Sequence, residues 1–328
     1  MGDVEMRNAF FLGLFSFLIL LFSLDLFAGN CPPLMRGSDS RTLWRLSAYQ
    51  PAKGVALVVH GLNNNPARMV SIENALRENS IDVLRLSLSG HNNNLNIFKH
   101  VTAEMWERDA LRAYCQANER AGKYGMPIYY VGYSLGGVIG VTVSSKYKQV
   151  HFDKMVLFAP AVAIRRTAFI MRILRTLNPL TVIPNLFNRE NYFANSTGTP
   201  VSAYRATFEL ANFANRHPNR QAINVPTLLF IDPLDELVSP SGIRSFIANY
   251  RLDEWKTFVV HKRPFSWQSI FHHLMIDAAS VGQRRWQEMK SAMIDHLEGK
   301  NLIQDHRLSS TPEWGESFYE LSNQIIQR

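Results

Sequence analysis

The sequence predicts an α/β protein whose central sheet is mostly parallel and is covered by helices on both faces. Short apolar runs alternate with longer amphipathic runs, which is the order of strands and helices in such a fold. The predicted strands are apolar almost without interruption, as is typical of strands buried on both faces. In such sheets ligands bind beyond the carboxyl ends of the strands, so functional residues are expected directly after each strand.

The strands are predicted from short apolar runs and the helices from longer amphipathic ones. The predicted strands are residues 54–61, 82–90, 127–134, 154–160, 226–232 and 257–263. The predicted helices are residues 66–79, 101–122, 135–148, 240–250 and 274–298. Pro66 in the first turn and Asn65 as a cap favour the start of the first helix.

Residues 1–30 differ in composition from the rest of the chain. One basic residue, Arg7, precedes an apolar run over residues 9–24, and small residues follow it. This layout is typical of a cleaved secretory signal, and the run of about 16 residues is short for a membrane span of ~20. An uncleaved membrane anchor and lipid attachment at Cys31 stay open as alternatives. The sequence therefore predicts a protein that is exported, periplasmic or secreted, or anchored to a membrane.

The segment 161–224 interrupts the alternation of strands and helices and is predicted to form a helical lid, or cap. It places about 60 residues between two strands, which is too long for an ordinary connection. The α/β core is accordingly assigned to residues 40–160 and 225–300. Residues 301–328 are expected to form a polar helical tail, for which the sequence suggests no role.

The first half of this lid segment is rich in arginine and has no acidic residue. Arg165, Arg166, Arg172 and Arg175 are interleaved with apolar residues at a spacing that allows one shared helix face. Two interpretations stay open: contact with a membrane surface or lipid chain, and an ordinary cap helix whose arginines lie in water. Both place an apolar roof over the expected ligand site at the sheet edge, which favours an apolar acyl or aryl group over a sugar or a peptide.

Charge and cysteine content limit the partners. The formal net charge is +8, but the charge is dispersed and no nucleic-acid-binding motif occurs, so nucleic acid is not an expected partner. The two cysteines, Cys31 and Cys115, allow one disulfide in an exported protein and are equally compatible with two free thiols.

The stretch GYSLGG, residues 132–137, predicts a nucleophile at Ser134. A serine hydroxyl needs a neighbouring base to attack at neutral pH, and a sharp turn from strand to helix exposes it at the sheet edge. Gly132 and Gly136 fit this turn because side chains at these positions would collide across it. The alternative is a serine that only caps the following helix.

The acid is expected in LLFIDPLDELVSP, residues 228–240, after the next long strand. Asp235 is the predicted acid because it lies in the loop just before the chain turns back into a helix. Asp232, directly at the strand end, is the competing candidate.

The base is expected in SIFHHLMID, residues 269–277, where two histidines are adjacent. His272 is predicted as the base because an acidic residue follows it five positions later, and His273 is the alternative. His60 and His91 follow other strands and are expected not to act as bases.

The oxyanion of a tetrahedral intermediate needs two hydrogen-bond donors. The backbone N–H groups of Leu135, after the serine, and of Leu62, in the loop HGLNNNP, are the predicted donors. Gly61 lets this loop approach closely, and His60 is expected to order it.

The order of HGLNNNP, SGHNNN, GYSLGG, DPLDELVSP and HHLMID resembles the α/β-hydrolase superfamily, nearest to monoacylglycerol lipases, lysophospholipases and related esterases. The resemblance covers roughly residues 50–298 and implies the α/β-hydrolase fold, with a doubly wound sheet and a helical lid at 161–224. It places the nucleophile on Ser134, the acid on Asp235, the histidine on His272 and the oxyanion donors on Leu62 and Leu135. Asn92 and Asp232 stand where the family usually has glycine.

These residues predict a serine hydrolase that cleaves carboxylic esters of a lipid-like substrate, such as a monoacylglycerol or lysophospholipid, through an acyl-enzyme. No metal or organic cofactor is expected, since the chain has no H-E-x-x-H, phosphate-loop or dinucleotide-binding motif. A thioesterase, acyltransferase or aminopeptidase on the same fold stays open, as does a binding protein without catalysis.

Overall fold

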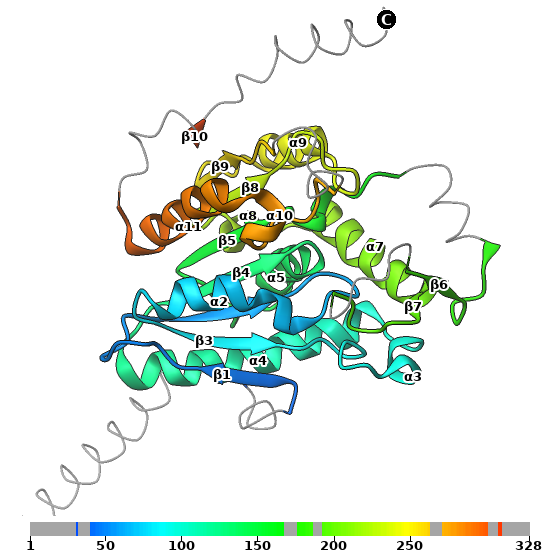
Figure 1. Ribbon diagram of the computed structural model, residues 1–328, viewed down its shortest axis with the longest axis horizontal. Helices are drawn as coiled ribbons and strands as arrows, with labels where there is room; N and C mark the ends of the chain where they lie inside the picture. Colours follow the sequence, from blue (N-terminus) through cyan, green and yellow to red (C-terminus); the bar gives the residue numbers. More distant parts are fainter. Residues whose placement is uncertain are drawn as a thin grey trace, which may run out of the picture.

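The computed structural model describes Cys31 and residues 40–166, 176–185, 192–262, 271–300 and 308–309 (Figure 1). The predicted signal or anchor at residues 1–30 lies outside the described residues, as do most of the predicted tail and the lid arginines Arg172 and Arg175. Across the described ranges, no helix is both long and apolar enough to cross a bilayer.

The centre of the molecule is an eight-stranded sheet with the strand order β1-β3-β2-β4-β5-β8-β9-β10. The two edge pairings, of β1 with β3 and of β10 with β9, are antiparallel, and all the others are parallel. The sheet is thus mostly parallel, as predicted. Its strands are β1 (Thr42–Arg45), β2 (Gly54–Val59), β3 (Ile81–Leu86), β4 (Ile128–Tyr133), β5 (Lys154–Phe158), β8 (Thr227–Ile231), β9 (Trp255–Val259) and β10 (Leu308–Ser309).

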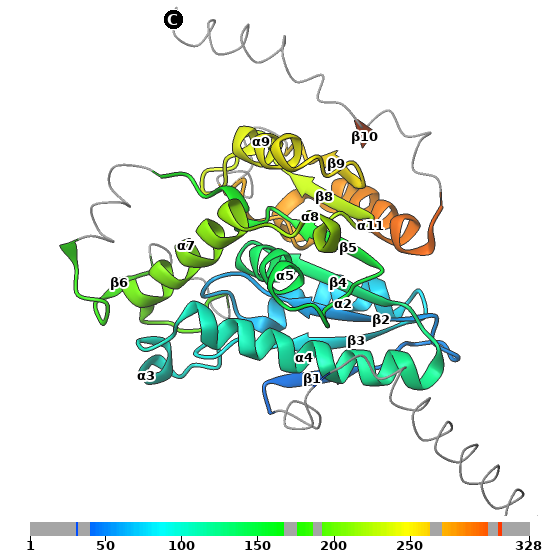
Figure 2. The same cartoon turned by 180° about the vertical axis from the view of Figure 1, so that it is seen from behind.

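Helices cover both faces of this sheet, because successive strand residues point to opposite sides. In β2, Val55 and Leu57 face one core with α4, α5 and α9, whereas Ala56 and Val58 face a second core with α2 and α11. Figure 1 shows the face covered by α2 and α11, and Figure 2 the face covered by α4 and α5. These helices are α2 (Val70–Arg77), α4 (Ala103–Tyr124), α5 (Leu135–Lys146), α9 (Pro240–Tyr250) and α11 (Gln283–Glu298).

Two predicted helices begin differently from the expectation. The first starts as a short 3-10 turn, η2 (Pro66–Met69), which the side chain of Asn65 caps by accepting from the Ala67 N–H. The last is split into α10 (Ala278–Val281) and α11, so the residues just before Ala278 lie in a loop. This loop contains both histidines of the predicted site.

The described part of the segment 161–224 has structure of its own. It contains η3 (Ala161–Ala163), the paired strands β6 (Val182–Pro184) and β7 (Gly198–Pro200), and the helices α7 (Val201–Arg216) and α8 (Arg220–Ile223). Small residues of α7, Ala203 and Ala206 among them, belong to the core that α4 and α5 share, so α7 packs on α5. Beyond α7, the pair β6 and β7 extends away from the sheet (Figure 1). The assignment of this segment as a lid stays a prediction.

The two cysteines form a disulfide between Cys31 and Cys115 of α4. The sequence left this pairing open. Both cysteines are buried, and the bond attaches the chain before β1 to the middle of α4. The Cys31 thiol is therefore engaged and is not free to carry a lipid while this bond is formed.

Candidate active site

Ser134 lies at the turn between β4 and α5, at the carboxyl edge of the sheet. Its backbone has φ 51° and ψ −109°, a conformation that residues other than glycine rarely adopt. The surrounding main chain holds it there. The Ser134 N–H donates to Phe158 O at 2.9 Å, and the Ser134 carbonyl accepts from the Ala161 N–H at 2.9 Å. The serine therefore projects from a strained turn that the neighbouring strand fixes.

The two glycines around Ser134 are required by close backbone contacts, as the sequence predicted. A Cβ atom on Gly136 would lie 2.2 Å from the carbonyl oxygen of Val59. A Cβ atom on Gly132 would lie 2.7 Å from the carbonyl carbon of Gly136. Real Cβ contacts are never this short, so only glycine lets α5 start this close to β2 and β4.

Ser134 is the first member of a hydrogen-bonded relay of three side chains. Its Oγ lies 2.8 Å from Nε2 of His273, and Nδ1 of His273 lies 2.8 Å from Oδ2 of Asp235. The His273 and Asp235 side chains are both buried. A serine, an imidazole and a carboxylate in this order form the arrangement that activates a serine for nucleophilic attack.

The prediction that His272 faces Ser134 is wrong. Nδ1 of His272 lies 2.9 Å from Oδ2 of Asp232, the other carboxylate considered, and it is His273 that meets Ser134. The prediction assumed that a helix begins close to the histidines and that the later acidic residue, Asp277, marks its first turn. The helix begins only after Asp277, which caps α10 through Ser280. Spacing from His272 to this residue thus carries no information on the relay.

The carboxylate of Asp235 is held as an anion. Its Oδ1 accepts from the N–H groups of Leu237 and Val238, both at 2.8 Å, while Oδ2 bonds His273. Burial acts to raise the pKa of this carboxyl, but the neighbouring imidazole, its hydrogen bond and the two N–H groups outweigh burial and lower the pKa. Asp235 therefore stays charged at neutral pH and can orient and stabilise a protonated imidazole.

The two predicted oxyanion donors belong to segments beside Ser134. Leu135 is the first residue of α5, where an N–H group has no acceptor within the helix. Leu62 follows Gly61, at which a Cβ atom would lie 3.4 Å from the Cβ of Ser134. The loop after β2 thus passes in contact with the serine. The assignment of both N–H groups as oxyanion donors stays a prediction.

His60 and His91 order this loop and take no part in the relay. Nδ1 of His60 donates to Gly61 O at 2.8 Å, and Nε2 accepts from the Leu88 N–H at 3.1 Å. Burial lowers the pKa of His60 to about 4, so it is neutral at physiological pH. Nε2 of His91 accepts from the Asn63 N–H at 2.9 Å. The two buried rings, 4.6 Å apart, therefore join the loops that follow β2 and β3.

An asparagine cluster, which the sequence analysis did not interpret, connects the same loop to the segment 161–224. The Asn195 N–H donates to Oδ1 of Asn63 at 2.9 Å, and Nδ2 of Asn195 donates to Gly90 O at 2.8 Å. Nδ2 of Asn63 donates to Oδ1 of Asn185 at 3.1 Å. The repeated Asn in HGLNNNP, which includes Asn63, was the available signal, because amide side chains both donate and accept between loops.

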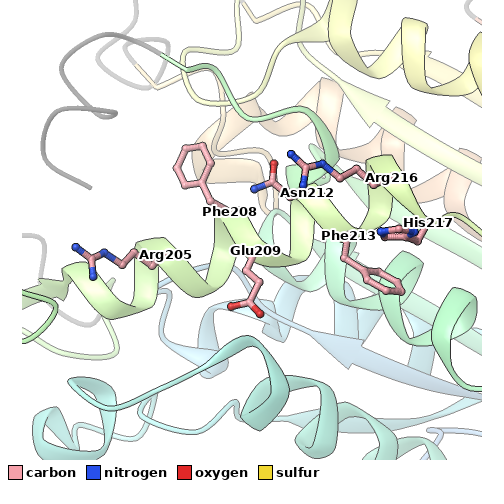
Figure 3. Close-up of a pocket in the computed structure, with 7 residues that line it drawn as sticks. All are labelled: Arg205, Phe208, Glu209, Asn212, Phe213, Arg216 and His217. Carbon is pink, nitrogen blue, oxygen red and sulfur yellow. The ribbon is translucent and has the colours of Figure 1, made fainter. Parts of the chain in front are cut away.

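Two other kinds of site are relevant besides the relay, a metal site and a surface hollow. Among the described residues, no group of three or more His, Cys, Asp and Glu side chains is arranged to hold a metal ion. An open hollow of about 390 Å³ runs along one face of α7 (Figure 3). It is lined by Arg205, Phe208, Glu209, Asn212, Phe213, Arg216 and His217, and so by none of the relay residues.

The chain resembles known hydrolases in family and in fold. A family model described as serine aminopeptidase, S33, matches residues 50–264. No match was found among curated proteins.

Similar solved structures cover most of the chain at low sequence identity, and such identity shows the fold alone. A soluble variant of the monoglyceride lipase from Saccharomyces cerevisiae, in complex with a substrate analog, has a TM-score of 0.64 at 12% identity, covering 80% of this chain and 94% of the other. A structure reported for LipS and LipT, two metagenome-derived lipolytic enzymes, gives 0.60 at 15% identity, covering 79% and 98%. The monoacylglycerol lipase of Paleococcus ferrophilus gives 0.54 at 15% identity, covering 78% and 98%.

Proposed function

The chain belongs to the serine aminopeptidase S33 family of α/β-hydrolases, and on that premise we propose that it hydrolyses carboxylic esters through Ser134, His273 and Asp235. The observation that carries the proposal is the relay itself, with 2.8 Å from serine to imidazole and 2.8 Å from imidazole to carboxylate. Both distances are those of direct hydrogen bonds.

In the proposed reaction, Oγ of Ser134 attacks the ester carbonyl carbon while Nε2 of His273 takes the hydroxyl proton. The carbonyl oxygen becomes an oxyanion that the Leu62 and Leu135 N–H groups bind. The C–O bond to the alcohol then breaks, and the departing oxygen receives the proton from His273. A water molecule repeats these steps on the acyl-enzyme and releases the carboxylic acid. Asp235 orients the imidazole throughout and stabilises its cationic form.

The surroundings of the relay favour an apolar acyl group. Leu234 and Leu237, on either side of Asp235, are 57% and 48% exposed, so two large apolar side chains are accessible in the loop that carries the acid. The Arg165 N–H donates to Leu237 O at 2.8 Å, so the start of the segment 161–224 lies against this loop. We therefore propose a lipid-like ester, such as a monoacylglycerol or lysophospholipid, as substrate. Contact of the segment with a membrane surface stays a prediction.

A chain-length series of p-nitrophenyl esters tests this proposal. The expected result is hydrolysis whose kcat/KM rises from acetate towards medium or long acyl chains, together with covalent labelling of Ser134 by a fluorophosphonate. The family description makes a free α-amino substrate the second candidate, so aminoacyl p-nitroanilides and acyl thioesters belong in the same series. Cleavage of the anilides without cleavage of any ester would replace the ester assignment with an aminopeptidase assignment. Failure of labelling would leave a binding protein without catalysis as the remaining alternative.

We also propose that the protein is exported, with residues 1–30 acting as signal or membrane anchor. The disulfide between Cys31 and Cys115 supports this, because such bonds persist in oxidising compartments. Fractionation of the native host and mass spectrometry of the mature chain test it. We expect the mature chain outside the cytoplasm, either soluble and without the apolar segment or membrane-bound and with it. We also expect that it has no free thiol. A full-length cytoplasmic chain with two reactive thiols would contradict export.

A further inference from the structure

The side chain of Lys262 holds the loop that carries the two histidines. Lys262 follows β9, and its Nζ donates to the carbonyl oxygens of Phe271 and Leu274, the latter at 2.5 Å. These two carbonyls lie directly before and directly after the pair His272–His273. One ammonium group therefore holds both ends of the four-residue histidine loop, residues 271–274.

The acid loop, residues 232–238, holds the same histidine loop from another direction. The backbone N–H of His273 donates to Oε2 of Glu236 at 3.1 Å, and Nδ1 of His272 bonds Asp232 at 2.9 Å. Because adjacent residues in an irregular loop project differently, fixing the main chain on both sides of the pair also fixes which imidazole points to Ser134. Lys262 is the group that bonds the main chain on both sides.

This arrangement is costly for a lysine, which indicates that it serves more than packing. Burial lowers the pKa of Lys262 to about 8, although Asp232, Glu236, Asp235 and Asp277 act in the opposite direction. Folding must therefore remove water from a charged group. An apolar side chain at this position would not carry this desolvation cost. Local costs of this kind concentrate at functional sites.

We propose that Lys262 is a positioning residue of the site, whose ammonium group fixes the histidine loop in the register that directs His273 to Ser134. This inference rests on the proposed function, because it assigns Lys262 a role in the reaction of that same relay. Lys262 is not placed in contact with substrate. It acts on the reaction through the main chain of the loop.

The charge of Lys262 has a second consequence that a purely mechanical support lacks. The carboxylates of Asp232, Asp235, Glu236 and Asp277 act on Lys262, and its positive charge offsets theirs. Arg68 also bonds Asp277, at 2.7 Å, and His272 bonds Asp232. Without the ammonium, the net field at the relay is more negative and favours a protonated imidazole. The acid limb of the pH–rate profile should then move to higher pH.

The test is Lys262→Met in the full chain, with Lys256→Met in β9 as the matched control. Methionine matches the unbranched stem of the lysine up to Cε and lacks its terminal nitrogen, and with it the charge and the donors. We expect Lys262→Met to lower kcat by about 10- to 100-fold, as for a small misplacement of a catalytic group, with KM changed less than about threefold. We expect its acid limb to shift upward and the control to match the wild type in all three readouts.

Equal kcat and an unshifted pH profile in Lys262→Met would overturn the proposal, provided that the wild type is labelled by a fluorophosphonate. If the wild type is not labelled, the proposed function fails instead, and the two failures are therefore distinct. If Lys262→Met does not fold, as judged by circular dichroism, Lys262→Ala with added ethylammonium decides. Recovery of activity supports the positioning role, and a folded protein without recovery overturns it.

Discussion

Ser134→Ala is expected to lower kcat for ester hydrolysis by roughly 10⁴- to 10⁶-fold, the order of the losses seen when one member of such a relay is removed. Oγ of Ser134 lies 2.8 Å from Nε2 of His273, and no other hydroxyl is placed on this imidazole in the part of the chain that the structure describes. Steady-state kinetics on the best p-nitrophenyl ester measures the loss. Mass spectrometry after fluorophosphonate treatment should show one adduct on the wild type and none on the variant.

The loss should not come from unfolding. Alanine at position 134 must keep the same strained backbone, φ 51°, and removes only the hydroxyl, so the melting temperature is expected to stay close to that of the wild type. Residual catalysis over water, roughly 10³-fold, can persist through the oxyanion donors and substrate binding. A variant that retains more than about 1% of the wild-type kcat would show that Ser134 is not the nucleophile.

The matched control is Ser145→Ala in the same helix. The hydroxyl of Ser145 is buried and has no hydrogen-bond partner, so its removal takes away no contact that the structure records. Burying an unsatisfied hydroxyl is itself unfavourable, and we expect unchanged kcat with equal or slightly higher stability. Loss of activity in this control would mean that small changes in α5 disturb the site.

Much of the core could be predicted because its strands are specified by local composition. The runs at residues 54–61, 127–134 and 226–232 are apolar on both faces and became β2, β4 and β8 in the parallel sheet. The strand β1 was missed because it lies at the edge of the sheet. Its residues, TLWR, include none that is fully buried and pair with β3 alone, so they lack the continuous apolar character of a central strand.

The nucleophile and the acid could be predicted because the contacts that fix them join residues close together in the sequence. Ser134 needs Gly132 and Gly136 across one turn, and Asp235 needs the N–H groups of its own loop, so local sequence contains both requirements. The histidine differs, because its two partners come from the turn after β4 and from the loop after β8. Which imidazole meets which carboxylate depends on the conformation of the loop before α10, and spacing does not encode it.

One feature of the sequence did contain the missing information. Asp232 stands where glycine is usual, and the structure shows why two carboxylates accompany two histidines. Asp232 bonds His272, and Asp235 bonds His273, so the loops are matched pair by pair. The unusual carboxylate at Asp232 was thus an available signal for a second histidine–aspartate pair, which the sequence analysis did not use. The disulfide is the opposite case, because the sequence left the pairing open and only the fold brings Cys31 to α4.

His273→Asn and His272→Asn should separate the two histidines most sharply. Asparagine places an amide N–H close to the position of Nδ1, so each variant can keep the bond to its own aspartate while losing Nε2. In His273→Asn the group that takes the Ser134 proton is gone, and kcat should fall by roughly 10⁴- to 10⁶-fold. In His272→Asn the relay is untouched, and kcat should stay within about tenfold of the wild type.

The comparison is informative because both substitutions lie in the same loop and share its main-chain contacts with Lys262 and Glu236. A general loosening of the loop would lower the activity of both variants alike, whereas loss of the base affects only one. Kinetics on the same ester, with melting temperatures recorded alongside, distinguishes these cases. If His272→Asn were the inactive variant and His273→Asn the active one, the loop would adopt the other register in solution. The bond between His273 and Ser134 would then not be the one that transfers the proton.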